Sequence, residues 1–316
     1  MKGGNEFSSK KLSANAEAWI FKLHQTLTIK EYGKGTLRSY VQEMTLLFKY
    51  YHDKSVEDII QGDIEQYLMY IKSAHQVGRA KCRSVAQSCS FFFKKVMPSA
   101  YIVPSNLYPK KQFILPNIMT EDEVRILIET AYLSIKEQSV IGLLYGSGMR
   151  ISELCNLRIK DIESSQKRIK IYQGKGDKDR YTLLPETIIE KLRQLYISEG
   201  RPQEYLFTSK QTKRAMHVRS MQLVVNSAMH KAGFKDRGFT AHTLRHSFAT
   251  HMLNLGNNIH VIKTLLGHSK IETTMIYLHL QRHTQLGIVS PLDILNQVTS
   301  EQNKNQHTKH DNAKSS

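Results

Sequence analysis

Four short segments of this chain carry side chains that could act on a phosphate group. In the first, LYGSGMRISEL, Gly146 and Gly148 are expected to break one helix and start another, which leaves Arg150 at the N-terminal end of the second helix. A helix N-terminus beside a guanidinium group suits a bound phosphate. Glu153, one turn further on, could pair with Arg150 or cap the helix. Taken alone, the pair is equally compatible with a surface ion pair worth about 0.3–0.5 kcal/mol.

The second segment, GKGDKDR, is a glycine-rich turn that contains Lys175 and Lys178. Its spacing is not that of a nucleotide-binding P-loop. By itself it indicates an ordinary hairpin turn with solvated charges. A lysine on such a hairpin could also reach into a site and donate a proton to a departing oxygen. Lys175 is the candidate, and the choice between Lys175 and Lys178 depends on a hairpin register that the sequence leaves open.

The third segment, HTLRHSFATH, has the apolar spacing of a helix with one buried face. His242 and Arg245 lie one turn apart on it and face the same way. His242 and His246 also have the i, i+4 spacing of zinc-binding helices. The glutamate of such helices is missing, and no carboxylate or cysteine cluster completes a ligand set, so no metal site is predicted.

The fourth segment, LLGHSKIETTMIY, runs from the end of one helix into the next. Gly267 is expected to end the first helix, and residues 270–280 are expected to form the second. His268 would then lie at the junction and Tyr277 on the second helix. A single tyrosine is usually a half-buried core residue, and this chain has 15 of them.

Together these segments supply what transfer of a phosphodiester to a protein hydroxyl would need. Arg150 and Arg245 could grip the nonbridging oxygens and stabilise the charge of the transition state. A tyrosine, with an ordinary pKa of about 10, would need a neighbouring base or cation to attack. Attack by Tyr277 would store the broken bond as a phosphotyrosyl ester. Rejoining would then need neither ATP nor a metal, so no cofactor is predicted.

The composition favours a polyanionic partner for the whole chain. The 316 residues contain 45 Lys and Arg against 28 Asp and Glu, a formal net charge of +17. Nucleic acid is the first candidate and an anionic membrane surface the second. Three cysteines without metal-type spacing indicate free thiols in a reducing compartment. Because no signal-peptide or membrane-spanning stretch is found, a cytoplasmic location is predicted.

The elements that must position these residues divide into two predicted domains, mostly α with one small antiparallel sheet. Apolar periodicity predicts four helices in residues 13–98, the third behind an N-cap at Ser55 and the fourth running from Gly78 or Arg79 to Val96. Residues 1–12 are expected to be flexible. Prolines at positions 98, 104, 109 and 116 mark 99–118 as a linker, since proline disfavours helix before it.

The second predicted domain spans residues 119–298. It opens with a capping box from Thr120 to Glu123, followed by a helical pair to about Arg158. Alternating runs on both sides of the GKGDKDR turn predict two antiparallel strands, and helices resume from Pro185. The polar, aperiodic residues 299–316 are expected to be a disordered tail.

In their order and spacing, these motifs resemble the tyrosine recombinase family, of the lambda-integrase and Xer type. The resemblance covers residues 120–280, and the helical first half resembles the family's core-binding domain. It implies a catalytic set with Tyr277 as nucleophile and His242 as the likelier base, supported by Glu153. The implied catalytic residues are Arg150, Lys175, His242, Arg245, His268 and Tyr277.

The resemblance further implies a clamp around duplex DNA, four subunits on paired recombination sites, and strand exchange through a Holliday junction. Residues 291–298 would form a helix that docks on a neighbouring subunit or folds back on its own domain. Candidate DNA contacts are Arg79, Lys81, Arg83, Lys110 and Lys111. The favoured role is integration or excision of a mobile element. The alternatives are an Xer-type resolvase of chromosome dimers, a type IB topoisomerase and an inactive DNA-binding relative.

Overall fold

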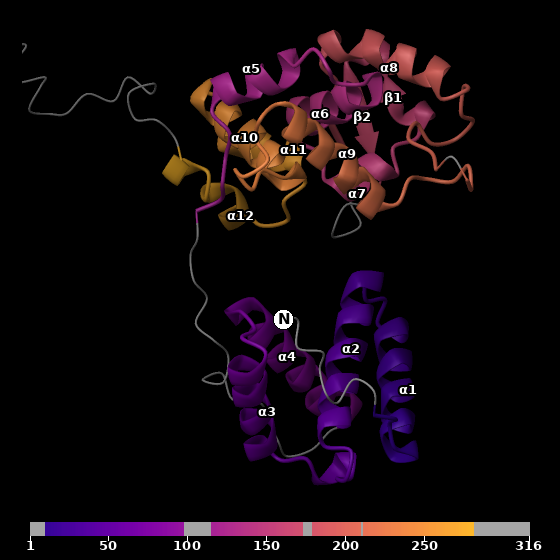
Figure 1. Ribbon diagram of the computed structural model, residues 1–316, viewed down its shortest axis with the longest axis vertical. Helices are drawn as coiled ribbons and strands as arrows, with labels where there is room; N and C mark the ends of the chain where they lie inside the picture. Colours follow the sequence, from indigo (N-terminus) through magenta and orange to yellow (C-terminus); the bar gives the residue numbers. More distant parts are fainter. Residues whose placement is uncertain (1–9, 98–114, 173–178, 210, 281–316) are drawn as a thin grey trace, which may run out of the picture. The chain divides into compact units, whose positions relative to one another are not determined.

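The computed structural model divides the chain into two compact units, residues 1–113 and 114–316 (Figure 1). It describes residues 10–97, 115–172, 179–209 and 211–280. Helices dominate both units, and the second contains a small antiparallel sheet, so the predicted fold class is confirmed. No helix in the described ranges is both long and apolar enough to cross a membrane.

The first unit is a bundle whose helices pack their apolar faces together. Trp19, Phe48 and Phe93 each place a ring against Phe92 in its core. The fourth helix runs into a wider π-type turn that carries Phe92 and Phe93 inward. The elements are α1 (Ala14–Ile29), α2 (Lys34–Tyr50), the 3-10 turn η1 (Val56–Asp58), α3 (Gln61–Ala74), α4 (Arg79–Phe91) and η2 (Phe92–Val96).

One predicted helix start in this unit is wrong. Ser55 precedes only the short turn η1, and α3 begins at Gln61 behind Ile60. Asp63 supplies the missing cap, because its carboxylate accepts a hydrogen bond from the Ile60 backbone N–H at 2.7 Å. A carboxylate in the first turn can therefore start a helix where the N-cap residue is apolar.

The second unit surrounds its small sheet with helices. Thr120 and Glu123 form the predicted capping box at its first helix. The elements are α5 (Glu121–Glu129), α6 (Ile135–Ser147), α7 (Ile151–Cys155), η4 (Ile159–Asp161), β1 (Ile162–Glu163), η5 (Ser164–Gln166), β2 (Arg168–Ile171), β3 (Arg180–Leu183), α8 (Glu186–Ser198), α9 (Val218–Lys231), α10 (Ala241–Asn254), α11 (Ile259–Leu266), α12 (Glu272–Met275) and η6 (Leu278–Leu280).

The sheet has three antiparallel strands in the order β1-β2-β3. Residues 168–171 of β2 pair with residues 180–183 of β3, which confirms the predicted strand pair. The sequence did not predict β1, because a two-residue strand is too short to show an alternating pattern. Along β3 the side chains of Arg180 and Thr182 are buried, while those of Tyr181 and Leu183 are exposed.

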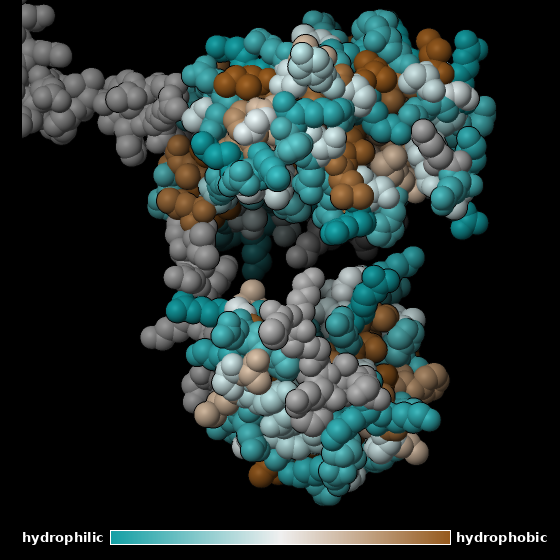
Figure 2. All heavy atoms as spheres, viewed as in Figure 1, coloured by the Kyte–Doolittle hydropathy of each residue, from teal (hydrophilic) through white to brown (hydrophobic). Residues whose placement is uncertain are grey.

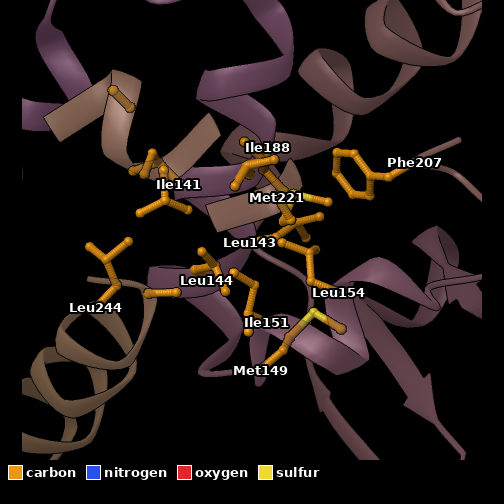
Figure 3. Close-up of a cluster of buried hydrophobic side chains, with 14 of the residues drawn as sticks. Ile141, Leu143, Leu144, Met149, Ile151, Leu154, Ile188, Phe207, Met221 and Leu244 are labelled. Atoms are coloured by element: carbon orange, nitrogen blue, oxygen red, sulfur yellow. The ribbon is translucent and has the colours of Figure 1, made fainter. Parts of the chain in front are cut away.

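Helix α6 lies at the centre of the main apolar cluster (Figure 3). Its Leu143 and Leu144 are fully buried. Gly146, expected to break this helix, lies within it instead. A Cβ atom there would come within 2.4 Å of Pro185, so Gly146 allows close packing before α8.

Hydrophilic residues cover much of the face seen in Figure 2.

Two helices in this unit end at glycines with left-handed backbone conformations. Gly148 closes α6 at φ +62°, and Gly267 closes α11 at φ +64°. Both positions favour glycine, since a Cβ atom strains this conformation. The predicted end at Gly267 is confirmed. Arg150, which follows the first turn, donates to the carbonyl of Gly267 in the second, so the two turns lie next to each other.

The segment after His268 differs from the predicted continuous helix. It forms only the short helix α12 and the 3-10 turn η6, and Tyr277 lies between them. The Tyr277 N–H donates to the Thr274 carbonyl, a tighter 3-10 bond. Thr273, Thr274 and Ile276 are β-branched residues, which lower helix propensity. Burial of Tyr277 then decides the local path of the chain.

Candidate active site

Glu153 is the carboxylate that joins two arginines of the second unit. Arg150 is the N-cap of α7, and the Glu153 carboxylate accepts from its backbone N–H at 2.7 Å and from its Nη1 at 2.8 Å. Arg180, at the start of β3, donates to both carboxylate oxygens at 2.9 and 2.8 Å. Burial would raise the pKa of Glu153, but the hydrogen bonds from Arg180 and Arg150 lower it to about 2. Glu153 is therefore ionised and holds Arg150 as well as capping the helix.

Three successive carbonyl groups at the end of α11 each accept a hydrogen bond from a different arginine. The Leu265 carbonyl accepts from Arg180 at 2.9 Å, and that of Leu266 from Arg245 at 2.6 Å. The Gly267 carbonyl accepts from Arg150 at 3.4 Å. Helix C-terminal carbonyls carry partial negative charge, so they attract cations. The end of α11 thus gathers three guanidinium groups around one turn.

Arg245 is the most deeply buried of these cations. It projects from α10 and also donates to the Gly148 carbonyl at 2.5 Å, which ties the end of α6 to the end of α11. Burial and the neighbouring Arg150 lower its pKa to about 10, so it keeps its charge at neutral pH. The side chain of Arg150 is 26% exposed, which makes it the member of the group that a ligand from solvent could reach first.

His268 lies next to Arg245 in a defined tautomer. Its Nε2 is 3.2 Å from Arg245 Nη2, and its Nδ1 is 2.9 Å from the Thr274 hydroxyl. A guanidinium group can only donate. Nε2 therefore accepts, and Nδ1 carries the proton. Burial, followed by the charges of Arg245 and Arg150, lowers the pKa of His268 to about 3, in agreement with a neutral ring.

Tyr277 is buried against this group of cations, with 1% of its surface exposed. Its hydroxyl is 2.9 Å from Nδ1 of His246, one turn along α10 from His242. Burial raises the pKa of Tyr277, and the charges of Arg245 and Arg150 oppose that rise. Burial, then His242 and Arg245, lowers the pKa of His246 to about 4. A neutral imidazole thus faces a neutral phenol and could accept its proton.

His242 occupies a more open position on the same helix. It is exposed, and its ring centroid lies 6.4 Å from that of His246. It lines a cavity of about 180 Å³ together with residues of α9, including Arg219, Gln222 and Asn226. Burial, then Arg245 and Arg150, lowers its pKa. His242 therefore lies in the positive potential of Arg245 and Arg150, while His246 contacts the Tyr277 hydroxyl.

This group of cations would suit a bound anion, and a tyrosine hydroxyl lies beside it. Three guanidinium groups share the single negative charge of Glu153. In the described ranges, no three His, Cys, Asp or Glu side chains gather in a way that could hold a metal ion. Cationic stabilisation and a nearby hydroxyl are the chemistry that the residues themselves offer.

Models of known protein families match the sequence of both units. The model of the phage integrase family matches residues 117–283, and the model of the phage integrase N-terminal SAM-like domain matches residues 19–101. A tyrosine recombinase of Thermosipho africanus is 31% identical over 274 residues, which cover 84% of this chain and 95% of that protein. The chain belongs to the phage integrase family. It is a tyrosine recombinase, an enzyme of site-specific DNA recombination, as its motifs predicted.

Solved structures agree with the fold of this recombinase. A lambda integrase fragment bound as a dimer to a COC' core site superposes with a TM-score of 0.65 at 18% identity, covering 83% of this chain and 94% of that one. XerH in its pre-cleavage complex with difH gives 0.64 at 19% identity, covering 88% and 97%. The N-terminal helical bundle and the C-terminal catalytic domain predicted from the sequence are confirmed as the fold of this recombinase.

The structure does not describe every residue that was predicted for the recombinase. Lys175, Lys178, Lys110 and Lys111 fall outside the described residues, as do most of the predicted linker, the helix at 291–298 and the tail. Among the candidates at the start of α4, Arg79 is exposed and Arg83 is half-buried. Lys81 instead donates to both oxygens of the buried Glu43, at 2.5 and 2.6 Å. Its charge is balanced within the bundle.

The sequence did not single out Arg180, His246 or Thr274 as members of this site. For Arg180 a signal existed, since an arginine occupies the inward-facing position of an alternating strand, where an apolar residue is usual. For His246 the i, i+4 relation to His242 suggested only a metal pair. No local pattern marks Thr274, because its partner His268 lies across a turn.

Proposed function

We propose that this recombinase cleaves and rejoins duplex DNA at specific sites through a 3′-phosphotyrosyl bond to Tyr277, and that it integrates or excises a mobile element. The observation that carries the proposal is that the buried Tyr277 lies beside a group formed by Arg150, Arg245 and His268, with its ring stacked on that of His268 and its hydroxyl within reach of the charges of Arg245 and Arg150. Such a group would bind the phosphate that the hydroxyl attacks.

In the proposed reaction the Tyr277 oxygen forms a bond to the phosphorus, and the bond from phosphorus to the 5′-oxygen breaks. Arg150 and Arg245 hold the nonbridging oxygens and stabilise the added charge. The phenol proton passes to a histidine. The family resemblance favours His242 for this step, whereas the 2.9 Å contact favours His246. Lys175 gives a proton to the leaving 5′-oxygen, and the reverse reaction with another 5′-hydroxyl rejoins the strand.

The assembly belongs to the same proposal. A lambda integrase tetramer has been solved on a Holliday junction, with a TM-score of 0.64 to this chain at 17% identity. That likeness supports a tetramer on two paired sites and strand exchange through such a junction. We further propose that residues 291–298 dock on a neighbouring subunit, and that Arg79, Arg83, Lys110 and Lys111 contact the DNA backbone from the core-binding unit and linker.

The test begins with isolation of a DNA site. The full chain is incubated with a library of randomised duplexes, the mixture is denatured, and DNA that remains attached to protein is sequenced. The enriched sequence is then built into a duplex with a nick near the cleavage position, so that the cut strand diffuses away. The wild type is expected to give a covalent protein–DNA band on a denaturing gel, and Tyr277→Phe is expected to give none.

A matched control is Tyr145→Phe, because the Tyr145 hydroxyl also lies 2.9 Å from a histidine of α10, His251. This variant loses a comparable half-buried hydrogen bond and should still form the adduct. Equal adduct from Tyr277→Phe, or none from the wild type, would refute the proposal. Relaxation of supercoiled plasmid by a monomer would indicate a topoisomerase, and binding without any adduct would indicate an inactive relative.

The biological role has one close alternative. A protein named integrase/recombinase from Escherichia coli is 29% identical over 321 aligned positions, and the recombinase XerA of Pyrococcus furiosus is 38% identical over 172 residues, 54% of this chain. The wild type is first tested for recombination between two selected sites on a plasmid. The position of those sites in the genome then separates the two roles. Sites that map to the borders of an element support integration or excision. A single site at a core chromosomal locus supports a resolvase.

A further inference from the structure

Arg180 is a buried cation for which the proposed phosphate-transfer steps have no use. Its side chain is 6% exposed. Nη1 and Nη2 donate to the two oxygens of Glu153, and Nε donates to the carbonyl of Leu265. All three of its nitrogens therefore bind protein groups, whereas the side chain of Arg150 is 26% exposed and can be reached from solvent.

The two partners of Arg180 belong to opposite sides of the site. Glu153 holds Arg150 through its backbone N–H and its guanidinium group. Leu265 lies in the last turn of α11, three residues before His268. These two sides are more than 100 residues apart in sequence. Arg180 is thus a direct link between the element that presents Arg150 and the element that presents His268.

The contact with the α11 terminus is also sterically tight. Gly267 has φ +64°, and a Cβ atom built on it would lie 2.8 Å from Cδ and 2.9 Å from Nε of Arg180. A planar guanidinium group therefore packs against the turn while its edge bonds to Glu153. Lysine could not reproduce this arrangement, because its single ammonium group reaches either the carboxylate or the carbonyl and lacks the planar fork.

We infer that Arg180 is a positioning residue, which sets the location of Arg150 and His268 relative to each other by bonding Glu153 on one side and the end of α11 on the other. The inference rests on the proposed function. It adds to that function a residue that never contacts DNA but controls how fast the bound DNA is cleaved.

The test compares Arg180→Lys and Arg180→Gln with Arg168→Gln. Arg168 is a suitable control because it lies on the same sheet and forms a similar ion pair, to Glu163 at 2.7 Å. Its side chain, unlike that of Arg180, is 42% exposed. We expect both Arg180 variants to bind the nicked duplex nearly as tightly as the wild type and to form the covalent adduct about 100-fold more slowly in single-turnover reactions. Arg168→Gln should keep both properties.

Two further measurements separate positioning from loss of fold. In a double-mutant cycle, Glu153→Gln and Arg180→Gln should be strongly non-additive in adduct rate, since they break one linkage. In addition, the imidazole signals of 13C-labelled His268 should shift in Arg180→Lys while those of His230, on the exposed end of α9, stay unchanged. Arg180→Lys keeps the positive charge, so it still provides the test if Arg180→Gln does not fold.

The outcomes are distinct from those of the proposed function. A wild type without adduct overturns the proposed function, and the His268 signals of the free protein then still test the link. Wild-type adduct rates in both folded Arg180 variants overturn the inference. So do additive effects with Glu153→Gln, or a rate loss matched by an equal loss of DNA affinity.

Discussion

Buried charge is arranged differently in the helical bundle and in the catalytic unit. In the bundle, Glu43 and Lys81 form one closed pair. In the catalytic unit, Arg150 and Arg180 bond to the carboxylate of Glu153, and Arg245 senses its charge without bonding to it. All three arginines fill other contacts with helix-end carbonyls. A balanced pair serves the fold, because ions must be compensated when they leave water. An excess of cations serves a site, because a bound anion completes the balance.

The largest expected effect breaks the catalytic side of this comparison. Arg150→Gln removes the most accessible cation and should slow adduct formation about 10²–10³-fold, because a transition-state donor is lost. The midpoint of thermal unfolding should change little, since Glu153 stays paired through both of its oxygens with Arg180. Single-turnover cleavage and a thermal melt measure the two properties. A large drop in stability with normal cleavage of the folded protein would instead make Arg150 a structural residue.

The next effect decides which histidine serves the tyrosine. His246→Gln should slow adduct formation about 10²-fold if His246 accepts the proton, as is typical of general bases. Because burial, His242 and Arg245 lower the pKa of His246 to about 4, the wild-type rate should not fall until the pH approaches that value. His242→Gln is the matched variant. A larger loss from His242→Gln would assign the base to His242.

A third change tests the balanced pair. Glu43→Gln leaves Lys81 without its carboxylate and should reduce the free energy of unfolding of the bundle by about 1–3 kcal/mol. The loss stays moderate because the Lys81 side chain is 38% exposed and can reach water. Chemical denaturation measures it, with the exposed Glu17→Gln as control. If the rate of cleavage of bound DNA also falls, the bundle pair contributes to catalysis and the contrast between the two units fails.

The smallest effect is a pH dependence of stability. His246 and His268 have folded-state pKa values of about 4 and about 3, lowered first by burial and then by neighbouring charge. These two histidines bind protons more tightly in the unfolded chain than in the folded one. Their contribution to the free energy of unfolding is therefore present above pH 6.5 and is lost as the pH falls toward their folded-state pKa values. When the pH falls from 7.5 to 5.5, each histidine should reduce the free energy of unfolding by about 1.4 kcal/mol.

Denaturation curves at pH 7.5 and pH 5.5 measure this loss, and most carboxyl groups titrate below that window. The variant His246→Gln should lose about 1.4 kcal/mol less than the wild type over the same range. An equal loss in both proteins would mean that His246 is protonated in the folded state. Its hydroxyl partner would then accept rather than donate in their hydrogen bond.

Much of the fold followed from local pattern. Apolar periodicity predicted the helices of the bundle, and the Thr120 capping box and Gly267 marked two helix limits that the structure confirms. The failures have local causes as well. Asp63 replaced Ser55 as a cap, and β-branched residues shortened the helix that precedes Tyr277.

By itself, the sequence determined the family and the class of chemistry, and it singled out Arg150, Glu153, Arg245, His268 and Tyr277 as candidate site residues, because those inferences depend on residue types in a fixed order. Only the tertiary structure decided that His246 holds the Tyr277 hydroxyl and that Arg180 joins Glu153 to the end of α11. It also decided that Lys81 balances Glu43. The physical reason is that such partners meet across long separations in the chain, where packing rather than local spacing chooses which donor reaches which acceptor.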